Sequence, residues 1–104
     1  VIHTVGPVYS GKPRDRQLLT GCYLNSLKLA VENNLATIAF PAISCGVYGY
    51  PIEDACKIAV DTSCVFLKTN ASLKKIIFIQ FSQQDYAVYK TYLKSIKIWQ
   101  MAMP

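Results

Sequence analysis

Residues 44–51 combine the residue types that most strongly suggest a ligand site. They read Ser-Cys-Gly-Val-Tyr-Gly-Tyr-Pro. Gly46 and Gly49 would let backbone N–H groups approach an anion closely, and a helix predicted to follow would point its positive N-terminus at the same place. Tyr48 and Tyr50 add flat faces that suit a sugar or a base. The segment therefore predicts a loop that holds a phosphate or diphosphate, although a tight turn with surface tyrosines would have the same composition.

Phe81 is a second candidate, because it ends the last apolar run that is predicted to form a strand. In open α/β sheets, ligands bind beyond the carboxyl ends of the strands. An aromatic ring there can stack on a base, which contributes about 1 to 3 kcal/mol in nucleic-acid sites. A core phenylalanine at the end of a buried strand is the equally supported alternative.

Residues 6–12 match the G-x-x-x-x-G-K spacing of a phosphate-binding P-loop, but the match fails at the next residue. Pro13 stands where the motif needs Ser or Thr, so no hydroxyl is available to hold magnesium. Pro7 also removes one of the N–H donors that would surround the phosphates. The sequence therefore argues against a nucleoside triphosphatase.

Other reactive side chains do not form a recognisable catalytic or metal-binding pattern. His3 and Cys45 could act as base and nucleophile, but they lie at different ends of predicted strands, and no third group orients them. One histidine and scattered cysteines give no metal-ligand spacing. Glu53 and Asp54 are adjacent, so they suit a helix N-terminus better than an acid and base pair. We predict no metal site and no cofactor.

The elements that must position these residues alternate regularly along the chain. Apolar spacing predicts strands at 1–5, 37–40 and 76–81, and helices at 18–33, from Pro51 to about Thr69, and from Ser82 through Ile96. Residues 8–17 are predicted to be a loop. This order predicts an α/β fold with parallel crossovers and helices on both faces of the sheet, in which the strand at 76–81 is covered on both sides.

Length and composition limit the chain to one globular domain of 104 residues. The 52% hydrophobic content excludes a disordered tail, and no apolar run reaches the roughly 18 to 20 residues of a membrane-spanning helix. Four cysteines, separated by 23, 11 and 8 residues, suggest reduced core residues and an intracellular location.

Charge supplies a rival functional hypothesis. The formal net charge is +5, and six lysines between Lys68 and Lys97 face only Asp85 in the last third of the chain. Such a surface could attract RNA or another anion. Because these lysines are spread along predicted helices without an aromatic stripe among them, solvated helix faces are the preferred interpretation, and nucleic acid is the less favoured partner.

Three segments together resemble the macro domain family, and most closely its MacroD-type, Appr-1-p processing branch. These segments are Val-Ile-His-Thr-Val-Gly-Pro at 1–7, Cys-Tyr-Leu-Asn-Ser-Leu at 22–27, and Ile-Ala-Phe-Pro-Ala-Ile-Ser-Cys-Gly-Val-Tyr-Gly-Tyr-Pro at 38–51. The strand at 76–81 and the Asp85-Tyr86 region are similar too. The resemblance covers the chain through Leu93.

This resemblance implies a three-layer α/β/α module that binds ADP-ribose. MacroD-type members hydrolyse ADP-ribose from proteins or deacetylate O-acetyl-ADP-ribose. The implied ligand-binding residues are Ser44, Cys45, Gly46, Val47, Tyr48, Gly49 and Phe81. The loop would hold the diphosphate through its N–H groups, Tyr48 would position the distal ribose, and Phe81 would lie by the adenine. Cys45 replaces the more common Thr, with little effect expected because that position acts through its backbone.

The resemblance also implies that this chain carries only the C-terminal part of the domain. Earlier strands, an Asn-Ala-Ala-Asn motif and a Gly-rich loop are not found in its sequence. We therefore leave catalysis open and expect ADP-ribose binding, with a non-catalytic reader of ADP-ribose or poly-ADP-ribose as the alternative. The expected partners are ADP-ribose or an ADP-ribosylated protein, in the cytoplasm or the nucleus. Self-association through an exposed sheet edge is a further expectation.

Overall fold

The computed structural model describes the backbone of residues 1–102 and the side chains of residues 1–96. Its elements follow one another as α1 (Pro13–Glu32), β1 (Thr37–Phe40), α2 (Ile52–Thr69), β2 (Lys75–Phe78) and α3 (Gln83–Ala102). This alternation confirms the predicted α/β class. Among the described residues no helix is long and apolar enough to cross a membrane.

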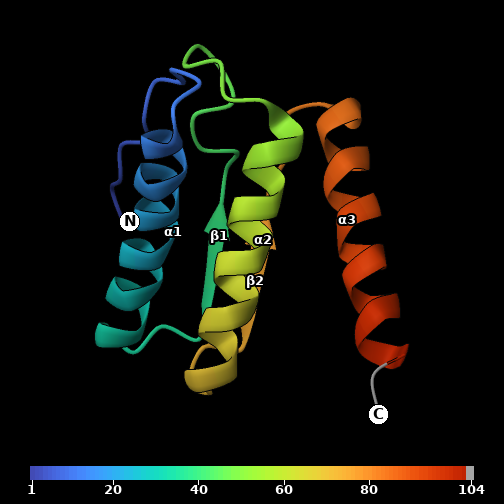
Figure 1. Cartoon of the computed structure of the whole chain (residues 1–104). Coiled ribbons are helices and arrows are strands. Elements are labelled where there is room, and N and C mark those ends of the chain that lie inside the picture. The colour runs from blue at the N-terminus through green and yellow to red at the C-terminus, as the bar shows by residue number, and fades with distance from the viewer. Residues whose placement is uncertain (103–104) are drawn as a thin grey trace.

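The two strands are parallel and joined by the α2 crossover. Thr37 pairs with Lys75, and Phe40 pairs with Phe78. Figure 1 shows α2 in front of the strands, with α1 and α3 on either side of it. The loop at 41–51 therefore leaves the carboxyl end of β1 and returns as α2 in front of the sheet.

All three helices pack on one face of this sheet. Phe40 and Phe78 are opposite each other in the ladder, so their side chains share a face. The Phe40 ring lies 4.9 Å from that of Tyr23 on α1, and the Phe78 ring lies 5.5 Å from that of Tyr89 on α3. The other face carries Ile77, which is exposed. The described helices therefore lie on one face only, and they form one helical layer of the incomplete three-layer α/β/α fold that the sequence predicts.

The predicted strand at 1–5 is not a strand in the structure. Val1 and Val5 are exposed, and Ile2 only partly packs on the core. The segment is held instead by Cys22, whose Sγ donates a hydrogen bond to the Val5 carbonyl at 3.3 Å. A strand requires a hydrogen-bonded neighbour, and within the described part of the chain no backbone hydrogen bond joins residues 1–5 to β1. The described residues therefore contain two strands where three were expected.

The first helix begins at Pro13, five residues before the predicted start, because Asp15 organises the preceding turn. Asp15 Oδ2 accepts hydrogen bonds from the N–H groups of Ser10, Gly11 and Lys12 at 2.8, 2.8 and 3.3 Å, and Oδ1 accepts one from Ser10 Oγ at 2.8 Å. Desolvation opposes the charge of this carboxylate, but these bonds prevail and lower its pKa. The N–H groups that a P-loop would offer to phosphate are thus bound to the protein's own carboxylate.

The second strand is shorter and more open than its apolar sequence predicts. It ends at Phe78, and Ile79 and Phe81 are exposed. The predicted coverage on both faces was wrong, because every described helix packs on the opposite side. The predicted helix cap is confirmed, since Ser82 Oγ accepts a hydrogen bond from Asp85 N at 3.1 Å.

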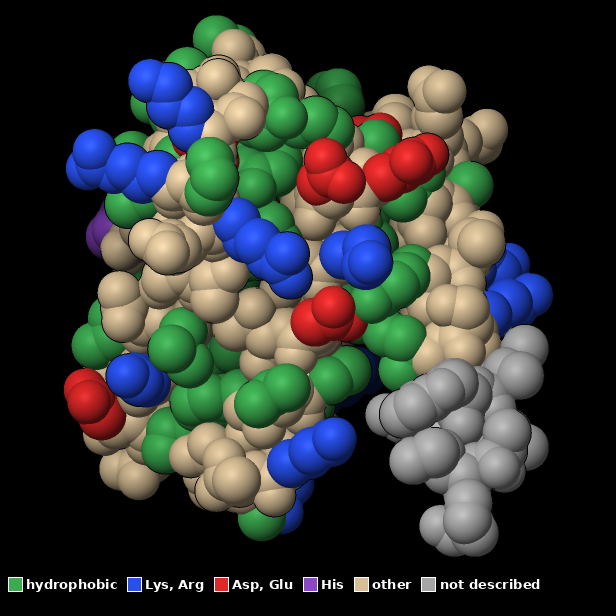
Figure 2. Space-filling view, in the orientation of Figure 1, with side chains coloured by type: hydrophobic (Ala, Val, Ile, Leu, Met, Phe, Trp, Pro, Cys, Tyr) green, Lys and Arg blue, Asp and Glu red, His purple; other side chains and the backbone are tan. Residues whose placement is uncertain are grey.

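Charged side chains are intermingled on the face formed by the helices. Figure 2 shows Asp and Glu side chains between Lys and Arg side chains on that face. Because opposite charges lie close together there, this face offers no continuous basic surface to a polyanion. The Lys97 side chain lies outside the described residues.

Candidate functional site

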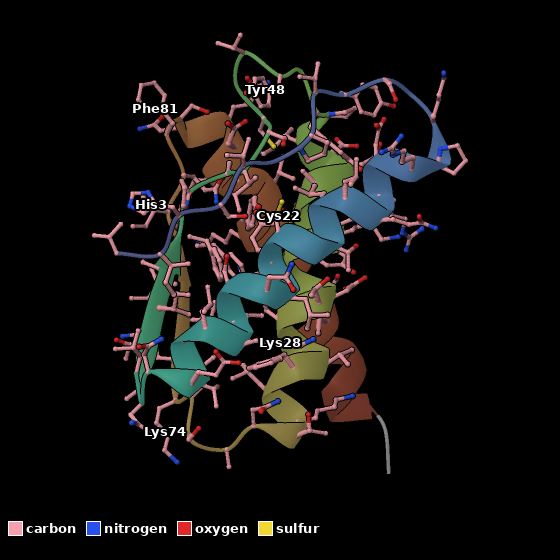
Figure 3. All side chains as sticks on the ribbon, turned by 90° about the vertical axis from the view of Figure 1, so that its left-hand side faces the viewer. His3, Cys22, Lys28, Tyr48, Lys74 and Phe81 are labelled. Atoms are coloured by element: carbon pink, nitrogen blue, oxygen red, sulfur yellow. The ribbon has the colours of Figure 1, made fainter. Side chains whose placement is uncertain are left out.

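The loop at 44–49 and Phe81 lie at the same end of the molecule. The loop follows the carboxyl end of β1, and Phe81 lies three residues beyond β2. Figure 3 shows Tyr48 and Phe81 at this end, each on its own connection. The Phe81 side chain is fully exposed, so its interpretation as a core residue was wrong. Parallel strands thus bring together the two features that the sequence singled out.

Three successive N–H groups in the loop are unpaired. The loop folds through bonds from Cys45 N to Ala42 O at 3.4 Å, from Gly49 N to Gly46 O at 3.0 Å and from Tyr50 N to Ser44 O at 2.9 Å. Within the described chain, the N–H groups of residues 46–48 make no hydrogen bond. Consecutive free N–H groups of this kind can bind a phosphate oxygen. The N–H of Cys45, by contrast, is already used within the loop.

The loop backbone is also strained at its first residue. Ser44 has a φ of 66°, in the left-handed region that costs a residue with a Cβ roughly 1 to 2 kcal/mol. Its Oγ is buried and makes no hydrogen bond. Gly49 has a similar φ of 73°, which glycine adopts without this cost. Strain of this kind is concentrated at ligand-binding sites.

The segment before α1 holds the loop in place, a role that the sequence did not reveal. A Cβ on Gly6 would lie only 2.1 Å from Ser44 Oγ, so glycine is required for this close approach. Tyr9 donates its N–H to the Tyr48 carbonyl at 2.9 Å, and its ring lies 5.0 Å from that of Tyr50. The Gly6-Pro7 pair indicated only a turn, and no local pattern marked Tyr9.

Helix α2 begins immediately after the loop. Its N-cap is Pro51, whose carbonyl accepts the Ala55 N–H at 3.0 Å, so the N–H groups of residues 52–54 have no partner within the helix. Glu53 and Asp54 in the first turn complement the helix dipole, as predicted. Because these side chains are negative, an anion in the loop would be held mainly by backbone N–H groups.

No activated nucleophile is found in the loop. Burial, with a further contribution from Asp85, raises the pKa of the Cys45 thiol to about 11. The Cys45 Sγ donates a hydrogen bond to the Ile43 carbonyl at 3.5 Å. The thiol is therefore neutral at pH 7 and a poor nucleophile. The described residues contain no group of three His, Cys, Asp or Glu side chains that could hold a metal ion.

Two relatives and a solved structure place this geometry among known proteins. An O-acetyl-ADP-ribose deacetylase of Klebsiella pneumoniae (strain 342) is 50% identical over 96 residues, which are 91% of this chain and 55% of the relative. The ADP-ribose glycohydrolase MACROD2 of Xenopus laevis is 48% identical over 93 residues, or 86% of this chain and 22% of the relative. An Oceanobacillus iheyensis macrodomain with ADP has a TM-score of 0.85 and 42% identity, covering 90% of this chain and 50% of that structure.

The family assignment depends on both sequence and structure. This chain spans about half the length of the bacterial relative and of the Oceanobacillus macrodomain. The family model described as Macro domain matches residues 1–59, which include the loop and the segment that holds it. The chain belongs to the macro domain family.

Proposed function

We propose that this chain binds ADP-ribose and that residues 44–49 hold its diphosphate. The observation that carries the proposal is the run of three unpaired N–H groups at residues 46–48, beside the start of α2. These groups can donate to phosphate oxygens without displacing an internal hydrogen bond. The Oceanobacillus macrodomain with ADP supports the assignment, because ADP carries the same diphosphate.

Aromatic side chains give the site its expected contacts with the rest of the ligand. Tyr48 is partly exposed and Phe81 fully exposed at the same end of the sheet. We assign Tyr48 to the distal ribose and Phe81 to the adenine, where a stacked ring would contribute about 1 to 3 kcal/mol. Val47 is fully exposed beside Tyr48, and its N–H makes no backbone hydrogen bond within the described residues.

Binding is a better supported activity of these residues than hydrolysis. The Cys45 thiol is neutral at pH 7, and the role that we propose for Tyr48 is to position the ribose rather than to activate water. Two relatives are named as an O-acetyl-ADP-ribose deacetylase and an ADP-ribose glycohydrolase, so we propose hydrolysis of an ADP-ribose derivative, either deacetylation of O-acetyl-ADP-ribose or removal of ADP-ribose from protein, as the corresponding activity of a whole domain. A reader that binds ADP-ribosylated protein without hydrolysis is the alternative, and release of ADP-ribose from a modified protein distinguishes the two.

Gly46 provides a direct test of the diphosphate site. A Cβ at Gly46 would meet nothing within 4 Å, so Gly46→Glu should leave the fold intact while placing a carboxylate among the phosphate-binding N–H groups. Gly21→Glu is the matched control, because Gly21 lies in α1 and a Cβ there also meets nothing within 4 Å.

ADP-ribose at about 100 times its dissociation constant should stabilise the chain by about 2.7 kcal/mol. The melting temperature should rise by about 4 to 8 °C per kcal/mol for a domain of this size. We expect the shift to persist in Gly21→Glu and to disappear in Gly46→Glu. Equal shifts in both variants would exclude the loop as the diphosphate site.

Basic side chains remain the basis of a weaker alternative, RNA binding. Binding to RNA should weaken steeply as salt is raised, because each phosphate contact releases counterions. The intermingled charges on the helical face do not favour RNA binding.

We also propose a cytoplasmic location for this chain. The four cysteines are free thiols in the structure, and thiols stay reduced in that compartment.

A further inference from the structure

Two buried tyrosine hydroxyls lie near the start of the ligand loop, residues 44–49. Tyr23 on α1 is fully buried, and Tyr89 on α3 is 3% exposed. Neither hydroxyl has a hydrogen-bond partner within the described part of the chain. Leaving a buried hydroxyl unpaired costs free energy, and a phenylalanine ring would fill the same space without that cost. The presence of both hydroxyls in the core therefore requires an explanation.

The rings that carry these hydroxyls are fixed by packing. The Tyr23 ring lies 4.9 Å from that of Phe40, and the Tyr89 ring lies 5.5 Å from that of Phe78. Phe40 and Phe78 stack on each other at 6.3 Å, so the four rings form one row from α1 across both strands to α3. A closely packed row holds each side chain in its rotamer. A partner for the hydroxyls must therefore come from a segment that moves toward them.

The residue in the right place is Ile43, which directly precedes the ligand loop. Burial raises the pKa of the Tyr23 hydroxyl to about 12, and the Ile43 N–H and the Tyr89 hydroxyl, which face it, act in the opposite direction. Burial also raises the pKa of Tyr89, so both hydroxyls are protonated at pH 7. Within the described residues the Ile43 N–H makes no backbone hydrogen bond. Two donors and one acceptor thus face one another without reaching hydrogen-bond geometry.

We propose that Tyr23 and Tyr89 are positioning residues for the ligand loop. When ADP-ribose binds, the start of the loop settles toward the row of rings, and the Ile43 N–H and the Tyr89 hydroxyl each donate a hydrogen bond to the Tyr23 hydroxyl. A hydroxyl oxygen has two lone pairs, so Tyr23 can accept both bonds. We call these three groups the tyrosine latch. The inference rests on the proposed function, because it concerns the same loop.

Ile43 is connected to the phosphate-binding part of the loop by short contacts. Its carbonyl accepts a hydrogen bond from the Cys45 thiol at 3.5 Å. Ser44, between the two, carries the carbonyl that closes the loop by accepting the Tyr50 N–H at 2.9 Å. Closing the latch would therefore fix the backbone immediately before the free N–H groups of residues 46–48. Because the latch bonds form only in the bound state, they add to the affinity and not to the stability of the free chain.

Three phenylalanine variants test the latch while keeping every ring. Tyr23→Phe removes the acceptor of both bonds, and Tyr89→Phe removes one donor. Tyr86→Phe is the matched control, because Tyr86 also lies on α3 but has an exposed side chain. ADP-ribose affinity is measured by isothermal titration calorimetry, and the melting temperature of each variant is measured without ligand. Helical circular dichroism verifies folding.

The affinity for ADP-ribose should fall about fivefold in Tyr89→Phe, which loses one hydrogen bond, and roughly tenfold or more in Tyr23→Phe, which loses two. It should not change in Tyr86→Phe. The melting temperatures without ligand should stay the same or rise, because the hydroxyls removed from the core are unpaired there.

Hydrogen exchange of the Ile43 amide, followed by NMR, supplies a readout that a merely structural role would not move. It should slow by roughly tenfold when ADP-ribose binds to the native chain, to Tyr89→Phe or to Tyr86→Phe. It should not slow in Tyr23→Phe, because the acceptor of the Ile43 N–H is then missing.

The outcomes separate this inference from the proposed function. If the native chain does not bind ADP-ribose, the proposed function is wrong and the latch falls with it. If the native chain binds and all three variants bind equally well, the latch alone is overturned. Loss of affinity together with a lower melting temperature without ligand would assign the hydroxyls a structural role and overturn the latch too. If Tyr23→Phe does not fold, the Ile43 amide of the native chain decides: slower exchange with ADP-ribose supports the latch, and unchanged exchange overturns it.

Discussion

Replacing Gly6 by alanine should damage both stability and ligand binding, because of one close contact. The new Cβ would lie 2.1 Å from Ser44 Oγ and 2.5 Å from Ile43 Cγ2, whereas ordinary contacts of this kind are 3.4 to 4 Å. The new Cβ and Ser44 Oγ must therefore move apart by more than 1 Å. Overpacking of this kind typically costs about 1 to 3 kcal/mol.

The damage should extend to the loop, because Ser44 is its first residue. Moving Ser44 away from Gly6 also moves its carbonyl, which accepts the Tyr50 N–H and closes the loop. We expect the melting temperature to fall by about 4 to 24 °C, at 4 to 8 °C per kcal/mol. ADP-ribose affinity should fall at least tenfold, which corresponds to about 1.4 kcal/mol. Thermal unfolding and isothermal titration calorimetry measure these two effects.

A second substitution identifies the contact responsible. Ser44→Gly removes the closest atom and also relieves the left-handed strain of Ser44, so it should partly rescue Gly6→Ala. Rescue should be incomplete, because Ile43 Cγ2 remains close. The coupling between the two substitutions should be about 0.5 to 3 kcal/mol in a double-mutant cycle.

Gly21→Ala is the control, since a Cβ there meets nothing within 4 Å and alanine favours a helix by about 1 kcal/mol. Two results would refute the reasoning about Gly6. One is an unfolding free energy for Gly6→Ala within about 0.5 kcal/mol of the native value. The other is strict additivity of Gly6→Ala and Ser44→Gly. Both depend only on stability, so they hold whether or not ADP-ribose binds.

Three further predictions concern the core and the titrating groups. Leu27→Ala removes a fully buried side chain of α1 and should lower the unfolding free energy, measured in urea, by about 2 to 5 kcal/mol. Asp15→Asn should lower the melting temperature at pH 7. Because folding lowers the pKa of Asp15 below its ordinary value of 3.8, its contribution is present above that value and is lost as pH falls through the folded pKa, so the difference between the two melting temperatures should shrink as pH is lowered below 3.8. Alkylation of Cys45 by iodoacetamide, followed by mass spectrometry, should accelerate about tenfold per pH unit from pH 7 to 9, because its pKa is about 11; a plateau near pH 8 would contradict the buried thiol.

Sequence reasoning located the helices and the ligand loop because their signals are local. Apolar residues three and four apart mark α1 and α2, and two glycines mark the loop between β1 and α2. The early start of α1 could also have been predicted from the sequence. Proline is common at the first helical position, as at Pro13, and an acidic residue is common in the first turn, as at Asp15. The charged residues around them were instead taken as a sign of a loop.

Contacts between distant segments could not be predicted in this way. Gly6 and Ser44 are far apart in the sequence, and only the folded chain shows that a Cβ on one would meet the other. The exposure of Ile77 and Ile79 also depends on distant segments. An apolar run is compatible with a strand that is covered on both faces, but the elements packed beside the strand decide whether it is covered. Residues 1–5 have strand-like side chains and remain unpaired for the same reason.

The N-terminal segment shows how a stretch without regular secondary structure can shape the ligand loop. It continues to Gly6, whose missing side chain allows Ser44 to approach, and to Tyr9, whose N–H donates to the Tyr48 carbonyl at 2.9 Å. Contacts that order the loop before ADP-ribose arrives reduce the entropy cost of binding, which raises the affinity. Weakening these contacts should therefore lower the affinity for ADP-ribose, although neither Gly6 nor Tyr9 is assigned a contact with the ligand. An extended segment without a ladder can therefore contribute to binding at a loop that it does not itself complete.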